Sequence, residues 1–131
     1  MKRILVIDDE ASITRGIKLN LEALGNYEVH QENHALAAVQ TARECQPDLI
    51  LLDVMMPDMD GGEIAAKLQE VPALKHIPII FLTAIVSNAE THGRETTIGG
   101  HEFLAKPVDV ATLAAAIETH LKRSRDSYWM L

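Results

Sequence analysis

Short apolar segments alternate with longer amphipathic stretches along the whole chain. From the apolar segments we predict five strands, at Ile4–Ile7, Tyr27–Gln31, Leu49–Leu52, Ile77–Leu82 and Phe103–Ala105. The first and the third are apolar at every position, which is typical of parallel strands that are buried on both faces.

The intervening stretches repeat apolar residues every three or four positions, as amphipathic helices do. They predict five helices, located around Ile13–Leu21, at Ala35–Cys45, Gly61–Glu70 and Ser87–Ile98, and after Asp109. Ser12 and Asp109 are candidate N-caps, because their side-chain oxygens can accept a hydrogen bond from a free N–H of the first turn. The fourth helix is the weakest, because glycine and threonine are poor helix formers. Its composition fits either a surface helix held by packing or a segment that rearranges easily.

This alternation predicts an α/β fold, a single doubly wound domain with a five-stranded parallel sheet covered by helices on both faces. The length of 131 residues fits one such domain. We expect the domain to occupy residues 1–122 and residues 123–131 to form a C-terminal tail or helix extension. The apolar end of this tail, Tyr128-Trp129-Met130-Leu131, is either a helix end or a contact with a partner or a second copy of the chain.

Composition narrows the partners and the location. The formal net charge is −7 and the only basic cluster is Lys122, Arg123 and Arg125, so we expect no direct binding to nucleic acid. No apolar run approaches the length that a membrane span or a signal peptide needs. The single cysteine, Cys45, is interpreted as a packing residue, since it cannot form an internal disulfide. A cytoplasmic location without membrane attachment is expected.

Polar residues stand at the carboxyl ends of four predicted strands. Asp8 and Asp9 follow the first strand, Asp53 ends the third, Thr83 ends the fourth and Lys106 ends the fifth. In an open α/β sheet these ends share one edge, where ligands bind. We therefore expect the five side chains to converge.

Three aspartates that converge repel one another unless positive charge offsets them. Lys106 supplies one positive charge, and a hard divalent cation with oxygen ligands would supply the rest. Mg²⁺ fits best, because the group lacks the soft ligands of a zinc site and the ligand number of a calcium cage. The chemistry available to such a site is phosphoryl transfer to an aspartate carboxylate, with a hydrogen bond from the Thr83 hydroxyl.

Four segments resemble the bacterial response-regulator receiver family, the CheY-like superfamily of two-component phosphorelay systems. They are Ile4–Glu10, Asp53–Gly61, Leu82–Ala84 and Phe103–Pro107, within a resemblance that covers essentially residues 2–122. The most diagnostic feature is a strand-ending aspartate, Asp53, with Pro57 and Gly61 four and eight residues later. The resemblance implies a flavodoxin-like (βα)5 fold with strand order 2-1-3-4-5.

The resemblance also assigns roles in phosphorylation. It implies that Asp53 is the phosphoacceptor and that Asp9 and Asp53 bind Mg²⁺ directly, together with the backbone carbonyl of Met55. Asp8 would act mainly through water, and Lys106 would contact the phosphoryl group. The donor would be a sensor histidine kinase or a phosphotransfer protein.

A conformational switch is the implied output. Thr83 and Phe103 match the coupled switch positions of the family, and their movement would change the face formed by the fourth helix, the fifth strand and the fifth helix. The downstream effector is unknown, and the protein is expected to be a monomer or a weak dimer linked to phosphorylation. Beyond accepting and losing its own phosphoryl group, the chain is not expected to be an enzyme.

Two apolar residues lead to a kinetic hypothesis. Met55 and Ile85 stand two positions after Asp53 and Thr83, and neither can orient an attacking water by hydrogen bonding. We therefore expect slow self-dephosphorylation.

Three alternative functions place different demands on the sequence. A phosphatase of the haloacid-dehalogenase type would need a second carboxylate where Met55 stands. A flavodoxin-like electron carrier would need a phosphate-binding loop where Asp8, Asp9 and Glu10 place negative charge. A degenerate receiver that binds partners without phosphorylation remains the main non-enzymatic alternative.

Overall fold

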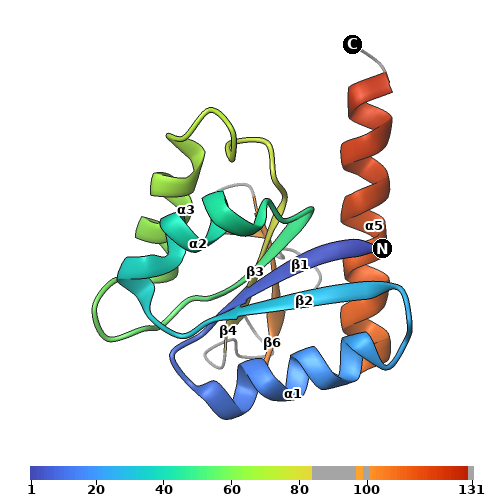
Figure 1. The fold of residues 1–131 in the computed structure, drawn as a ribbon, viewed down its shortest axis with the longest axis horizontal. Helices are drawn as coiled ribbons and strands as arrows, with labels where there is room; N and C mark the ends of the chain where they lie inside the picture. Colours follow the sequence, from blue (N-terminus) through green and yellow to red (C-terminus); the bar gives the residue numbers. More distant parts are fainter. Residues whose placement is uncertain (84–96, 99–100, 130–131) are drawn as a thin grey trace.

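The computed structural model describes residues 1–83, 97–98 and 101–129 (Figure 1). Its elements are β1 (Lys2–Ile7), α1 (Ala11–Glu22), β2 (Tyr27–Glu32), the 3₁₀ turn η1 (Ala35–Ala37), α2 (Ala38–Cys45), β3 (Leu49–Asp53), α3 (Gly61–Gln69), β4 (Ile79–Thr83), β5 (Thr97–Ile98), β6 (His101–Ala105) and α5 (Val110–Trp129). The five predicted strands are present as β1, β2, β3, β4 and β6, each within about two residues of its predicted bounds.

The sheet has the order β2-β1-β3-β4-β6-β5. All pairs among β2, β1, β3, β4 and β6 are parallel, which confirms the predicted strand order 2-1-3-4-5 for the five main strands. The two-residue strand β5 adds to the edge of β6 in the antiparallel direction.

The predicted helix Ser87–Ile98 needs one correction. Its residues up to 96 lie outside the described part of the chain, but Thr97 and Ile98 form strand β5 and are not helical. They pair with Glu102 and His101. Both are β-branched residues, which favour strands over helices, and the pairing satisfies backbone groups that a helix end would leave free.

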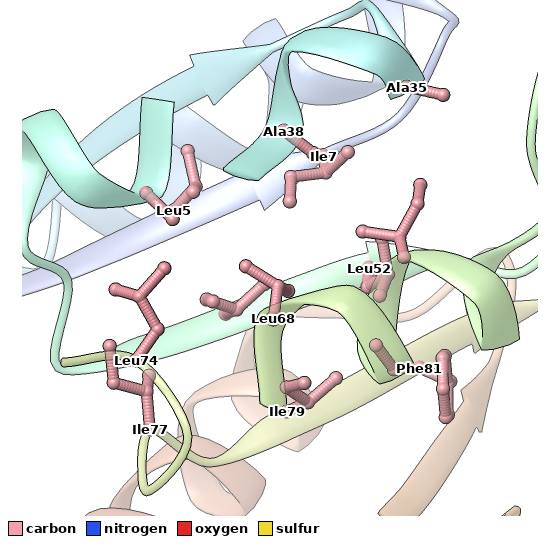
Figure 2. Close-up of a cluster of buried hydrophobic side chains, with 14 of the residues drawn as sticks. Leu5, Ile7, Ala35, Ala38, Leu52, Leu68, Leu74, Ile77, Ile79 and Phe81 are labelled. Carbon is pink, nitrogen blue, oxygen red and sulfur yellow. The ribbon is translucent and has the colours of Figure 1, made fainter. Parts of the chain in front are cut away.

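Two separate cores cover the faces of the sheet, because successive side chains of a strand point to opposite faces. One face packs under α2 and α3 and carries Leu5, Ile7, Ile50, Leu52, Ile79 and Phe81 (Figure 2). The other packs under α1 and α5 and carries Ile4, Val6, Leu49, Leu51, Ile80 and Leu82. The predicted helix stripe Leu113 and Ile117 lies in this second core. These cores hold the strand ends in fixed positions.

Three residues at or near helix ends can be compared with their predicted roles. The Asp109 carboxylate accepts the backbone N–H of Thr112 at 2.8 Å, as expected of the N-cap of α5. The Ser12 expectation is wrong, because α1 already begins at Ala11 and places Ser12 inside its first turn. Cys45 ends α2 and packs against the core under α2 and α3, as expected of a packing residue.

An ion pair on α1 forms hydrogen bonds to the free outer edge of β2. Lys18 Nζ lies 2.8 Å from the Glu22 carboxylate and donates to the carbonyl of Val29 at 2.9 Å. The same Glu22 carboxylate accepts the backbone N–H of Val29 at 3.0 Å. These bonds occupy the two outward-facing backbone groups of Val29, which protects the edge strand from pairing with another chain.

Helix α5 extends well past the sheet. It continues through Trp129, and Figure 1 shows its last turns beyond the start of β1. Residues 123–129 are therefore helical. Within the described residues, no helix is both long enough and apolar enough to cross a bilayer.

The start of α3 is fixed directly against the end of β3. Gly61 donates its N–H to the carbonyl of Val54 at 2.8 Å. A Cβ atom at Gly61 would lie 2.7 Å from the carbonyl oxygen of Asp53 and 2.9 Å from Cα of Val54. These are backbone atoms that no side-chain rotation can move away. The glycine eight residues after Asp53 is therefore required by the close approach of the chain.

We predict that Gly61→Ala destabilises the protein by about 1–3 kcal/mol, because the added methyl group forces the β3–α3 backbone apart. Urea unfolding measures the change. Gly16→Ala is the matched control, since nothing lies within 4 Å of a Cβ at Gly16 in α1, and there alanine should stabilise by up to about 1 kcal/mol. Equal effects of the two substitutions would contradict the close-approach argument.

Candidate functional site

The carboxyl ends of four strands bring the predicted polar residues together. Asp8 follows β1, Asp53 ends β3, Thr83 ends β4 and Lys106 follows β6. The ends are level because Asp53 is in register with Leu82, and Thr83 with Ala105. Oxygen atoms of Asp8, Asp9 and Asp53 all lie within 4.8 Å of one another. The expected convergence of the three carboxylates is present in the structure.

The three carboxylates differ in burial. Asp8 is fully buried and Asp53 is 4% exposed, whereas Asp9 is exposed. The cluster therefore has a buried base formed by Asp8 and Asp53 and an outer side at Asp9, from which an ion or a substrate can approach.

Lys106 joins the two buried carboxylates. Its Nζ donates to Asp8 Oδ2 at 2.7 Å and to Asp53 Oδ1 at 3.0 Å. The side chain is only 15% exposed. The backbone N–H of Lys106 donates to the carbonyl of Thr83 at 2.8 Å, which extends the β4–β6 ladder as far as the site. The lysine thus reaches the carboxylates from a backbone position fixed by the sheet.

Burial and charge act in opposite directions on these groups. Burial raises the pKa of Asp53 above its ordinary value, the hydrogen bond from Lys106 lowers it, and the charge of Asp8 raises it again, so that the net shift is upward. For Lys106, burial lowers the pKa, but the hydrogen bonds to Asp8 and Asp53 outweigh it and the net shift is also upward. The ammonium therefore stays charged, and one positive charge faces three carboxylates.

The excess of negative charge and the donor atoms fit a magnesium ion. All ligands that the cluster offers are hard carboxylate oxygens, with no sulfur or imidazole among them. Lys106 occupies one oxygen each of Asp8 and Asp53. We expect Asp9 and Asp53 to bind Mg²⁺ directly and Asp8 to act mainly through water, and this assignment stays a prediction. The expected role of the Met55 carbonyl stays a prediction.

The two expected switch residues lie on neighbouring strands. Thr83 is 4% exposed at the end of β4. Phe103 is in register with Phe81 and packs, partly buried, against the core under α2 and α3. Ile85 lies outside the described residues. Movement of Thr83 and Phe103 stays a prediction.

An open hollow lies beside Lys106. It has a volume of about 470 Å³ and lies between α1 and the segment that joins β6 to α5. Ile13, Ile17, Pro107 and Val108 supply much of its apolar lining. The Lys106–Pro107 peptide bond in its wall is cis.

The sequence analysis missed a group of uncharged polar residues that support Asp8. Asn33 Nδ2 donates to the backbone carbonyl of Asp8 at 2.8 Å and to Thr14 Oγ1 at 3.0 Å. Thr14 is fully buried, and its hydroxyl lies 3.0 Å from Gln31 Oε1. The available signal was weak: Gln31 and Asn33 stand near the carboxyl end of a predicted strand, at the same edge as the aspartates.

Comparisons with known proteins agree with this geometry. The family model of the response regulator receiver domain matches residues 4–118. The chain is 34% identical to the DNA-binding dual master transcriptional regulator RpaA of Synechocystis, over 95% of this chain and 51% of that protein. It is 38% identical to the response regulator PleD of Caulobacter vibrioides, over 89% of this chain and 25% of that protein.

The fold comparison gives the same result. The crystal structure of the chemotaxis protein CheY4 of Vibrio cholerae superposes with a TM-score of 0.77 at 28% identity, over 91% of this chain and 98% of that one. The chain spans about half the length or less of these two curated relatives. The family model covers most of the chain, and the site has the acidic cluster and the lysine expected of that family. The chain therefore belongs to the response regulator receiver domain family, the phosphorylation-activated signalling domains of two-component systems.

Proposed function

We propose that Asp53 accepts a phosphoryl group in a Mg²⁺-dependent reaction and that the domain then signals to a partner or to an output domain. The observation that carries the proposal is the ammonium of Lys106 held between the carboxylates of Asp8 and Asp53. A buried aspartate at a strand end, bonded to a fixed cation and close to further carboxylates, is suited to nucleophilic attack on phosphorus.

The transfer is an in-line displacement. A carboxylate oxygen of Asp53 forms a bond to phosphorus while the bond from phosphorus to the leaving atom of the donor breaks. No general base is needed, because the attacking carboxylate carries no proton. Bound Mg²⁺ would neutralise charge on the transferring group. Lys106 would stabilise the same charge, and the Thr83 hydroxyl would donate to a phosphoryl oxygen.

The donor is proposed to be a histidine kinase or a phosphotransfer protein. The hollow lined by Ile13, Ile17 and Val108 supports this proposal, because it opens next to Lys106 and offers apolar surface to a protein donor. A small phosphodonor would need only the acidic cluster. The phosphorylated domain would then act through a shift of Thr83 and Phe103 and of the surface around β6 and α5.

Chemical phosphorylation tests the acceptor directly. We predict that incubation with acetyl phosphate and Mg²⁺ adds the mass of one phosphoryl group, measured by intact mass spectrometry, and that chelation of the metal or Asp53→Asn abolishes the gain. Asp58→Asn is the matched control, since Asp58 is an exposed aspartate five residues away, and this variant should be phosphorylated normally. A gain that persists in Asp53→Asn would exclude Asp53, and no gain in wild type would favour a degenerate receiver.

The raised pKa of Asp53 predicts a pH-dependent effect on stability. An acid with a raised folded pKa is costlier to ionise in the folded than in the unfolded protein. This energetic cost is absent at acid pH. It grows as the pH rises above the pKa of Asp53 in the unfolded protein, and it levels off above the pKa of Asp53 in the folded protein. Asp53→Asn should therefore raise the free energy of unfolding near neutral pH, and the gain should vanish at acid pH.

Urea unfolding across this pH range, with the metal chelated, measures the effect of Asp53→Asn. Asp58→Asn again serves as the control and should show no comparable gain. A difference between Asp53→Asn and wild type that stays constant with pH would contradict the charge argument.

The exposed Met55 side chain underlies the proposed slow dephosphorylation. It is 59% exposed beside the acceptor and offers no strong hydrogen bond to water. We predict that Met55→Asn accelerates loss of the phosphoryl group, because an amide can orient the attacking water, whereas Met55→Leu does not. The decay of the phosphorylated mass after removal of the donor measures the rate. Fast decay of the wild type, unchanged in Met55→Asn, would refute the hypothesis.

A further inference from the structure

Asp8 has four polar atoms, the backbone N and O and the two carboxylate oxygens, and each of them has a hydrogen-bond partner. Its backbone N–H donates to the carbonyl of Glu32 at 3.1 Å, and its Oδ1 accepts the N–H of Glu10 at 3.0 Å. Its Oδ2 accepts from Lys106, and its backbone carbonyl accepts from Asn33 Nδ2 at 2.8 Å. The last of these bonds is the one that fixes the peptide group between Asp8 and Asp9.

The Asn33 amide is itself held in one orientation. One N–H reaches the Asp8 carbonyl and the other reaches Thr14 Oγ1 at 3.0 Å. Both partners accept at these positions, so the NH₂ group must point toward them. The fully buried Thr14 hydroxyl lies within hydrogen-bond distance of Gln31 Oε1 at 3.0 Å and of the Ala11 carbonyl at 3.1 Å. The network therefore connects the end of β2 to the first turn of α1 across the loop that carries the aspartates.

This arrangement matters most for Asp9. Asp9 is exposed, yet its carboxylate lies within 4.8 Å of those of Asp8 and Asp53. An exposed aspartate in an unrestrained loop would spend much of its time elsewhere, because the three like charges repel. Fixing the Asp8–Asp9 peptide keeps the Asp9 backbone in place when no cation is bound.

We propose that Asn33, supported by Thr14 and Gln31, is a positioning residue that preorganises the Asp8–Asp9 pair for Mg²⁺. The inference rests on the proposed function, since it concerns the same site. It assigns these residues a role in metal affinity, without contact with the metal or with the phosphoryl group. Partners outside the ligand set typically change metal affinity by about 10–100-fold when removed.

The test compares Mg²⁺ binding in folded variants. Asn33→Leu keeps the approximate shape and removes both donors, and Thr14→Val keeps the shape and removes the hydroxyl. Calorimetric titration with Mg²⁺ should show affinity about tenfold weaker in Asn33→Leu and weaker in Thr14→Val, with Thr14→Ser close to wild type. Circular dichroism confirms that each variant is folded.

Two further readouts separate positioning from general stability. In the metal-free protein, the Glu10 amide should exchange with solvent faster in Asn33→Leu than in wild type. Phosphorylation by acetyl phosphate should be slow at limiting Mg²⁺ and should recover when Mg²⁺ is raised to saturation. Thr41→Val is the matched control, since Thr41 Oγ1 bonds the side chain of Glu32 on the same strand, without contact with Asp8, and its Mg²⁺ affinity should equal that of wild type.

The outcomes distinguish this inference from the proposed function. Wild type that binds Mg²⁺ while folded Asn33→Leu and Thr14→Val bind it equally well would overturn the positioning role alone. Wild type that neither binds Mg²⁺ nor gains a phosphoryl group would overturn both. Weakened binding in Thr41→Val to the same extent as in Asn33→Leu would also overturn the positioning role, because the effect would then be general.

Discussion

The hydrogen-bonded ion group of Lys106, Asp8 and Asp53 is the interaction on which the site depends. Two carboxylates lie at the buried carboxyl ends of β1 and β3, where burying negative charge carries an energetic cost. The ammonium of Lys106 offsets part of that cost and places positive charge where a phosphoryl group would arrive. With Asp9 at the outer side, the three carboxylates and one ammonium need one divalent cation for charge balance, and this imbalance is the physical basis of the proposed Mg²⁺ binding.

The fold holds these charges together at the carboxyl edge of the sheet. The two hydrophobic cores on opposite faces fix the strands, and the register of β3, β4 and β6 places their ends level. Gly61 lets the start of α3 pack directly on the backbone of Asp53. The Asn33 network restrains the loop after β1 in the same way. The acidic cluster is thus held in place by the packed sheet, by the start of α3 and by the Asn33 hydrogen bonds.

The fold and the convergence of the charged residues could be predicted because they depend on patterns along the chain. Consecutive apolar residues in Ile4–Ile7 and Leu49–Leu52 identify buried strands, and topology then brings Asp8 and Asp53 together. Individual hydrogen bonds and backbone pairings outside this convergence of strand ends could not be predicted. Ser12 looked like a cap although α1 begins before it, and nothing local showed that Asn33 reaches Asp8 or that Thr97 and Ile98 pair with β6.

The central claim is that this charge arrangement makes Asp53 a Mg²⁺-dependent phosphoacceptor. A crystal structure of the protein with Mg²⁺ and beryllofluoride, a stable mimic of a phosphoryl group, tests it most directly. The account predicts beryllofluoride bonded to a carboxylate oxygen of Asp53, in contact with Lys106 and Thr83, and Mg²⁺ bound by Asp9 and Asp53. Beryllofluoride on another residue, or an acidic cluster without metal at saturating Mg²⁺, would contradict it.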